Sequence, residues 1–180
     1  MMRSFLLTLL LVSADAALAQ TQTPYAGMES RAVKALSEQQ IADLRAGRGM
    51  GLALAAELNG YPGPVHVLEL AEGLGLTAEQ KARVQSLFEA MKAETIPLGE
   101  RLIAQEAALD ELFATRRVSQ TSLRASTAEI GETQAALRYA HLAYHLSTLA
   151  VLSEAQIARY AELRGYGTSP TRGHDQKKHH

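Results

Sequence analysis

The chain has 180 residues and carries 18 basic and 19 acidic side chains, so its formal net charge is −1 with neutral histidines. A nearly neutral chain of this kind does not fit a nucleic-acid-binding protein, which carries a strongly basic surface. The sequence contains no cysteine, which excludes disulfides, thiolate metal sites and cysteine nucleophiles.

The N-terminus has the pattern of a secretory signal peptide. Arg3 precedes an apolar run from Ser4 to Val12, and Ala17-Leu18-Ala19 places small residues before a cleavage position. The alternative is an uncleaved membrane anchor, but a spanning helix needs about 20 apolar residues and this run is shorter. We therefore predict a signal peptide over residues 1–19, a periplasmic location, and no integral membrane segment in the mature chain.

The mature chain is expected to divide into three parts. Residues 20–26 are polar and form a flexible N-terminus. Residues 27–166 form a single helical domain, which is long enough to bury its own core. Residues 167–180 lack apolar periodicity and form a disordered tail that contains His and Lys.

The motif L-[ST]-x-x-Q occurs three times, at Leu36–Gln40, Leu76–Gln80 and Leu152–Gln156. In each copy the Ser or Thr hydroxyl can accept a hydrogen bond from the backbone amide three residues later. The Gln side chain can reach back to the amide of the capping residue. The motif therefore predicts three helix starts, and it carries no chemistry by itself.

Two long segments with apolar stripes lie between the second and third copies of the motif. After Thr77, apolar residues recur at spacings of three and four, and from Leu123 onward they recur every seven residues. Pro97 is expected to bend the first helix without ending it, and Arg116–Val118 to form the turn. Since no strand pattern is present, we predict an all-α fold, a long bent antiparallel hairpin with short flanking helices.

The region before the hairpin is rich in glycine and proline. The first predicted helix carries Gly47, Gly49 and Gly51, which indicates either a weak, frayed helix or a surface for close packing; the propensity cost favours the first interpretation. The segment Asn59–Pro64 is incompatible with a helix. A short helix is predicted over Val65–Glu72, with a proline in its first turn.

Histidines are the main candidates for chemistry. His141 and His145 are separated by four residues on the second hairpin helix, so their side chains project from the same face and can share one metal ion. The alternative is a pair of half-buried core histidines. The tail adds His174, His179 and His180, which could capture metal only loosely.

Counting from the hairpin turn brings further side chains toward this pair. If the chain turns near Arg117, then His145 faces the region of Glu89, and a short helix that folds back brings His66 to the same end. We therefore predict a candidate metal site of His141, His145, His66 and Glu89. These ligands suit an ion of Zn, Ni, Co or Cu, which the sequence does not distinguish.

The sequence lacks the signatures of common enzyme classes. It has no G-x-S-x-G, no H-E-x-x-H, no P-loop and no dinucleotide-binding glycine motif. We therefore expect a protein that is not an enzyme and that requires no cofactor.

The export signal, the hairpin and the helix starts at Leu76–Gln80 and Leu152–Gln156 together resemble the periplasmic Spy/CpxP family, and the related metal-linked proteins ZraP and CnrX are similar in architecture. The resemblance covers about Val65–Tyr166. It implies a bent, dimeric hairpin that binds unfolded clients without ATP, or, in CnrX-like members, a nickel or cobalt sensor. His141 looks like the ligand histidine of those sensors, and His145 stands where they carry methionine.

The chain also departs from the sensors. They carry a His-x-x-x-His pair on the first short helix, whereas His66 is followed at that spacing by Leu70. The resemblance therefore implies an ATP-independent, chaperone-like or envelope-stress binding protein, with periplasmic heavy-metal binding or sensing as the alternative. Unfolded or membrane-associated proteins are the expected clients and a homodimer the expected assembly. A third possibility is an adaptor for one membrane partner.

Overall fold

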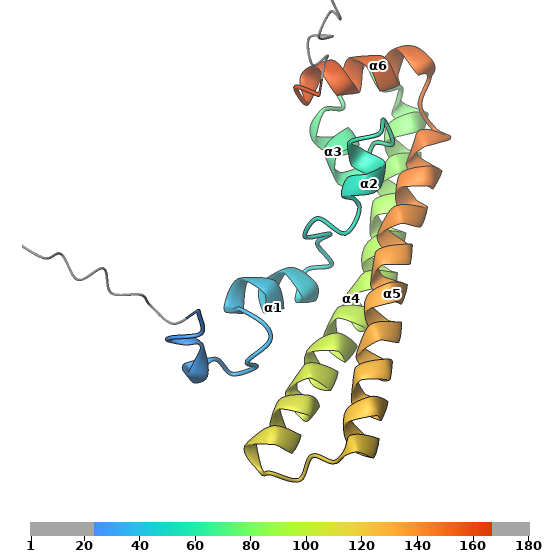
Figure 1. Cartoon of the computed structure of the whole chain (residues 1–180). Helices are drawn as coiled ribbons and strands as arrows, with labels where there is room; N and C mark the ends of the chain where they lie inside the picture. The colour runs from blue at the N-terminus through green and yellow to red at the C-terminus, as the bar shows by residue number, and fades with distance from the viewer. Residues whose placement is uncertain (1–23, 167–180) are drawn as a thin grey trace, which may run out of the picture.

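The computed structural model describes residues 24–166, and within that range the chain is helical and contains no strand (Figure 1). The all-α prediction is therefore confirmed. The elements are η1 (Met28–Ser30), α1 (Glu38–Arg45), α2 (Leu54–Glu57), α3 (Pro64–Glu69), α4 (Ala78–Ala114), α5 (Gln120–Leu149) and α6 (Glu154–Leu163). The predicted signal peptide and tail lie outside the described residues. Among the helices that are described, none is long and apolar enough to cross a membrane.

Helices α4 and α5 form the predicted antiparallel hairpin. Helix α4 continues through Pro97, and α5 begins after Ser119, whose hydroxyl accepts from the Ser122 amide. Arg116 adopts a left-handed conformation (φ 56°) in the turn between them. The two helices diverge toward this turn, and α6 crosses the opposite end of the hairpin (Figure 1).

All three L-[ST]-x-x-Q motifs start helices, as predicted. Ser37, Thr77 and Ser153 each form a capping box with the glutamine three residues later. Two of these glutamines also meet across the hairpin, because Gln80 and Gln156 donate to each other's side-chain oxygen at 2.9 and 3.0 Å. The motif thus joins the start of α4 to the start of α6, a tertiary role that its local pattern did not predict.

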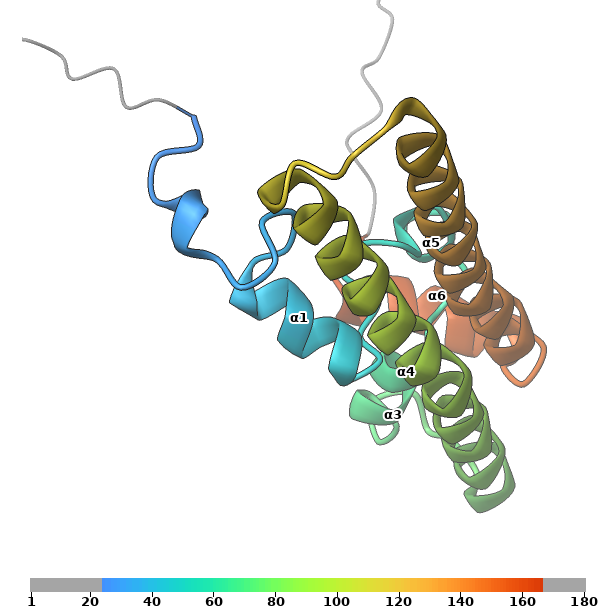
Figure 2. The same cartoon turned by 90° about the horizontal axis from the view of Figure 1, so that it is seen from below.

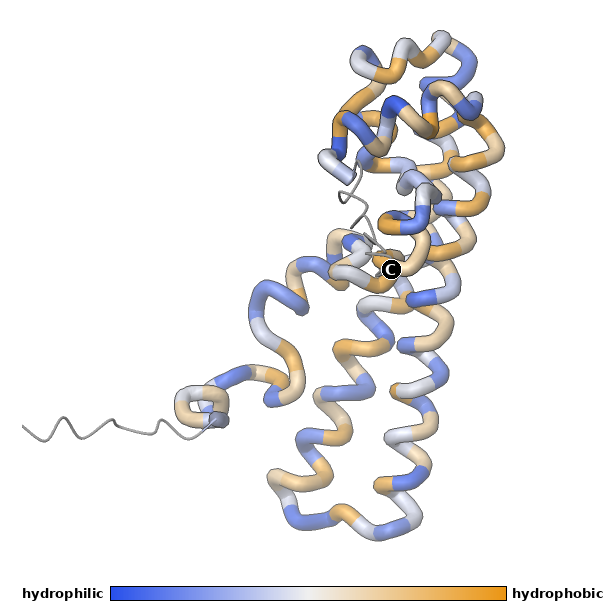
Figure 3. Tube along the Cα trace, turned by 45° about the horizontal axis from the view of Figure 1, so that its top comes forward, coloured by the Kyte–Doolittle hydropathy of each residue, from blue (hydrophilic) through white to orange (hydrophobic). Residues whose placement is uncertain are grey.

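Two apolar clusters hold the helices together. The first lies toward the hairpin turn and joins α1 to α4 and α5; its buried members are Val33, Leu36, Leu44, Leu102, Ile103, Ile130 and Leu137. The second lies toward α6; its buried members are Val67, Leu74, Val84, Leu152 and Tyr160. Apolar positions recur between polar ones along both hairpin helices (Figure 3), as expected for amphipathic helices.

The N-terminal segment lies along the hairpin. Helix α1 runs beside α4 (Figure 2), and the approach is close at Gly99, where an added Cβ would lie 2.6 Å from the Leu44 carbonyl oxygen. The prediction that the first helix carries three glycines is wrong, because α1 ends at Arg45. Gly47 and Gly51 have φ of +66° and +85°, a left-handed conformation that ends helices and forms turns.

Candidate metal site

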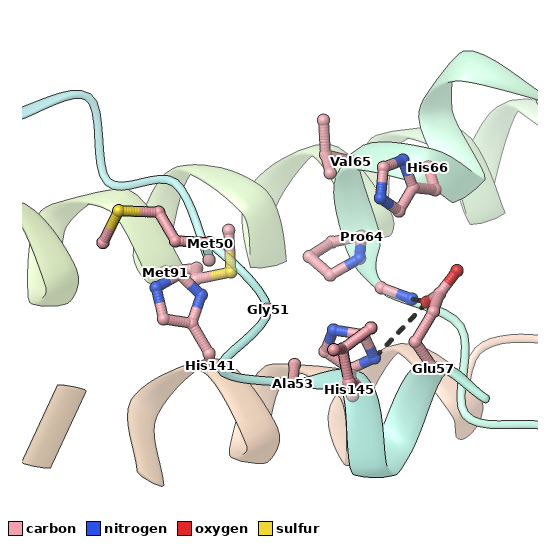
Figure 4. A pocket seen from close by; sticks show the side chains of 13 residues that line it. Met50, Gly51, Ala53, Glu57, Pro64, Val65, His66, Met91, His141 and His145 are labelled. Carbon is pink, nitrogen blue, oxygen red and sulfur yellow. Dashed lines mark hydrogen bonds and ion pairs between the residues drawn. The ribbon is translucent and has the colours of Figure 1, made fainter. Parts of the chain in front are cut away.

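A pocket of about 170 Å³ lies between the two apolar clusters, and it has room for an ion with a few waters at about 30 Å³ each. Its walls come from the segment before α2, from α2, from the start of α3 and from the facing sides of α4 and α5 (Figure 4). The lining residues are Gly49, Met50, Gly51, Ala53, Leu54, Glu57, Gly63, Pro64, Val65, His66, Met91, His141 and His145. Every histidine within residues 24–166 thus lines one pocket.

His141 is buried on α5 with an unsatisfied ring nitrogen. The residue is 3 % exposed, and its buried Nε2 has no hydrogen-bond partner among residues 24–166. Gly49 packs against the other side of the ring, where an added Cβ would lie 3.5 Å from Nδ1. Burial lowers the pKa of His141, and the nearby His145 lowers it further, so the neutral imidazole is favoured.

His145 lies one helical turn further along α5, and its Nδ1 contacts two neighbouring oxygen atoms. Its Nδ1 is 2.6 Å from the backbone carbonyl oxygen of Tyr61 and 3.8 Å from a carboxylate oxygen of Glu57 (Figure 4). The backbone of Gly63 crosses the ring, and an added Cβ would lie 2.8 Å from both Cε1 and Nε2. The loop before α3 therefore presses directly against this imidazole.

His66 reaches the pocket from α3, as the predicted fold-back of the short helix required. It is more exposed than the other two histidines and contacts a residue outside the pocket. Its Nδ1 lies 2.9 Å from the Glu69 carboxylate, and its side chain is about one-third exposed. In Figure 4 the ring of Pro64 lies between His66 and the two imidazoles of α5. The three histidines share a pocket without forming a closed set of ligands.

Glu89 does not belong to this site, which corrects the prediction that it supplies a carboxylate. It is exposed on α4 and accepts a hydrogen bond from Gln85. Counting residues from the turn predicted how far along the hairpin Glu89 lies, but it did not predict which face of α4 carries its side chain. Two positions correspond to about 200° of rotation, so Glu89 and the pocket-lining Met91 lie on opposite sides of α4.

Two further pocket residues that could act as ligands or as their hydrogen-bond partners were not predicted from the sequence, because both come from the N-terminal segment. Met50 stands at the pocket in a left-handed conformation (φ 44°), which is uncommon for a side chain of this size. Glu57 is buried at the end of α2. The glycines around Met50 were a signal for a turn, but nothing local indicated that this turn would reach α5.

The donor set fits a soft or borderline metal ion better than a hard one. Within the described part of the chain, no three His, Asp or Glu side chains are arranged to hold a metal ion. The pocket instead combines the imidazoles of His141 and His145 with the thioethers of Met50 and Met91. Imidazole suits copper, zinc and nickel, and thioether sulfur favours copper.

Comparison with known proteins identifies the family of the chain. A family model described as LTXXQ motif family protein matches residues 65–164, more than half of the chain. No curated protein and no solved structure shows a significant match. The matched segment contains α3 to α6, whereas Met50 and Glu57 precede it. From this match and the paired motifs across its hairpin, the chain belongs to the LTXXQ motif family, which is the Spy/CpxP-like family.

Proposed function

We propose that this LTXXQ-family protein works in the periplasm as a metal-binding or metal-sensing protein, with a copper site at His141, His145 and Met91. The periplasmic location is supported by the N-terminal export pattern and by the usual location of the family. The role is binding rather than catalysis.

The buried Nε2 of His141 is the observation that carries the proposal. A buried polar atom without a partner costs about 1–3 kcal/mol, so such an atom calls for a ligand. A metal ion would satisfy it, and His145 lines the same pocket with its Nδ1 already engaged. The buried Met91 would add a soft ligand, while Met50 at the rim could complete the set.

Calorimetric titration of the mature chain tests the proposal. His174, His179 and His180 are replaced by Ala so that the tail does not compete. Cu²⁺, Zn²⁺, Ni²⁺ and Co²⁺ are titrated directly, and Cu⁺ by competition with a chelator. We expect copper to bind with a Kd below ~10 μM, about −7 kcal/mol, and more tightly than the other ions.

Three variants show whether the binding belongs to the pocket. His141→Ala and His145→Ala should each lose most of the affinity, because one imidazole alone does not chelate. His66→Ala is the matched control and should lose much less, since Glu69 already engages its ring. If no ion binds with a Kd below that limit, or if a protein with both His141→Ala and His145→Ala binds as well as the parent, these histidines are core residues.

Client binding is the second candidate, and a surface feature supports it. A shallow apolar groove of about 220 Å³ is lined by Ala55, Ala56, Tyr61, Leu142 and Leu146. Leu146 is 59 % exposed, and exposed apolar patches mark binding surfaces.

An aggregation assay tests this second role. The protein should suppress aggregation of a denatured model protein without ATP, and Leu146→Ser should reduce the effect. Phe113→Ser is the control, since Phe113 is similarly exposed at the far end of α4. Equal suppression by both variants would exclude this groove as the client site.

A further inference from the structure

Glu57 is a buried carboxylate with an unusual number of donors around it. It lies at the end of α2, and it is 7 % exposed. Its Oε1 accepts from the Tyr160 hydroxyl at 2.5 Å and from the Tyr166 hydroxyl at 3.0 Å. Its Oε2 accepts from the Gly63 amide at 3.3 Å. The carboxylate therefore links α2, the loop before α3, and α6.

The same carboxylate faces the Nδ1 edge of the His145 ring. The carbonyl oxygen of Tyr61 can only accept a hydrogen bond, so His145 Nδ1, 2.6 Å away, must carry the hydrogen. Glu57 Oε2 lies 3.8 Å from this Nδ1 and favours the N–H electrostatically. In the neutral ring, Nε2 then keeps its lone pair, and this nitrogen is the one beside Gly63 at the pocket.

The other side of Glu57 is held by the end of α6. Arg164 Nε lies 3.5 Å from Glu57 Oε1, and the Arg164 guanidinium also donates to the Tyr166 hydroxyl at 3.2 and 3.1 Å. Burial and the neighbouring carboxylate raise the pKa of Tyr160, so its hydroxyl stays protonated and donates. Breaking this cluster would leave a buried charge without partners, which is strongly unfavourable.

We infer that Glu57 is the positioning residue of the pocket: it reinforces the Nδ1–H tautomer that the Tyr61 carbonyl sets in His145, which leaves Nε2 free as a ligand, and it ties the end of α6 to that imidazole. The metal part of this inference rests on the proposed copper site, whereas the tautomer does not. Histidine ligands commonly donate their second nitrogen to a carboxylate or a carbonyl, and losing such a partner lowers metal affinity by about 10- to 100-fold.

The arrangement makes α6 sensitive to the state of the pocket. A metal ion on His145 Nε2 would strengthen the Nδ1–H hydrogen bond to Tyr61 and the attraction to Glu57. Glu57 in turn accepts from Tyr160 and Tyr166. The coupling must also act in reverse, because effects between two linked sites are reciprocal. Occupancy of the pocket should therefore order the end of α6, and loosening α6 should weaken binding.

Glu57→Gln is the main test, because it removes the charge and turns one of the two oxygens into an N–H₂ group. That group then faces either the Gly63 amide and His145 Nδ1, or the Arg164 guanidinium and the two tyrosine hydroxyls. Glu69→Gln is the matched control, since Glu69 also contacts a pocket histidine, His66, but is exposed. Tyr166→Phe removes one donor from the α6 side and is mild enough to leave the fold intact. The readouts are the ring ¹⁵N shifts of His145 without metal, the copper affinity, and amide hydrogen exchange in α6.

We expect wild-type protein to show the Nδ1–H tautomer and copper to slow exchange in α6. Glu57→Gln should weaken the tautomer preference without abolishing it, because the Tyr61 carbonyl still accepts from Nδ1, and it should bind copper about 10- to 100-fold more weakly. Glu69→Gln should change affinity by less than about twofold. Tyr166→Phe should reduce the copper-dependent protection of α6. If Glu57→Gln is too unstable to study, the Tyr166→Phe variant decides. The inference is overturned if that variant keeps the wild-type copper affinity and the wild-type copper-dependent protection of α6.

Two further results separate this inference from the proposed function. If wild-type protein binds no copper, yet His145 carries its hydrogen on Nδ1 and this preference weakens in Glu57→Gln, the copper site is wrong and the positioning role stands. If wild-type protein binds copper, and Glu57→Gln has the same copper affinity and the same His145 tautomer population, the inference is wrong and the copper site stands.

Discussion

The two glycines beside the α5 imidazoles differ in how closely they approach the rings. A Cβ added to Gly63 would lie 2.8 Å from His145 Nε2, whereas one added to Gly49 would lie at an ordinary 3.5 Å from His141 Nδ1. Because His145 is buried and hydrogen-bonded, Gly63→Ala should destabilise the fold by about 1–3 kcal/mol. Gly49→Ala should stay within about 0.5 kcal/mol. Urea denaturation of both variants checks this, and equal midpoints would contradict the packing described at Gly63.

The pH dependence of copper binding follows from the burial of His141. Protons compete with the metal for neutral imidazole. The pKa of His141 lies below the ordinary value of 6.5 because of burial and His145, so this ring stays neutral to lower pH than an exposed histidine. Affinity should hold near neutral pH and fall only as the pH drops below about 6.5. Chelator competition between pH 5 and 8 measures it; a loss that begins well above 6.5 would be inconsistent with a buried ligand.

At the scale of the element, the three helix-start motifs are alike in sequence but not in structure. Gln80 caps α4 and also exchanges hydrogen bonds with Gln156, whereas Gln40 closes only its own capping box on α1. Gln40→Ala should therefore cost about 1 kcal/mol. Gln80→Ala should cost more, by about 1–3 kcal/mol, because the half-buried Gln156 side chain loses its partner. Thermal unfolding distinguishes them; equal losses would mean that the bridge contributes nothing.

The docking of α1 on α4 can be tested with a second pair of glycines, both inside long helices. Gly99 faces the Leu44 carbonyl oxygen, which would lie 2.6 Å from an added Cβ. Around Gly131, in the described part of the chain, no atom beyond its own helix backbone lies within 4 Å of that position. Gly131→Ala should stabilise the protein by up to about 1 kcal/mol, from helix propensity alone. Gly99→Ala should be destabilising in spite of the same propensity gain, because α1 must move. Hydrogen exchange in α1 should rise in the second variant only.

For the whole molecule, large apolar side chains remain on the surface of the described chain. Those on α2, α4 and α5 are Leu54, Phe113, Tyr139 and Leu146, and Leu58 directly follows α2. A hairpin that buries one stripe per helix leaves such side chains for a partner, and a symmetric homodimer is the common solution. Light scattering at tens of micromolar should give twice the chain mass, and Leu146→Lys should shift the mass toward one chain. A single-chain mass for the parent protein would end this prediction.

What the sequence determined by itself is the local part of the structure. Helix starts at Ser37, Thr77 and Ser153 follow from capping, which involves residues only three positions apart. The shared face of His141 and His145 follows from helix geometry. The hairpin follows from two apolar stripes and a short turn, because amphipathic helices must bury their stripes against each other.

Only the tertiary structure decided the composition of the pocket. Met91, and not the predicted Glu89, lines the pocket from α4. Met91 belongs to the apolar stripe that is visible in the sequence, but only the packing of α4 shows that this stripe faces the two imidazoles. Met50 and Glu57 enter from a segment more than eighty residues before His145, and its path is set by the turns at Gly47 and Gly51. Long-range contacts of this kind leave no local pattern, since each partner's sequence is compatible with many neighbours. The sequence therefore contained both α5 imidazoles, but only the fold showed which groups surround them.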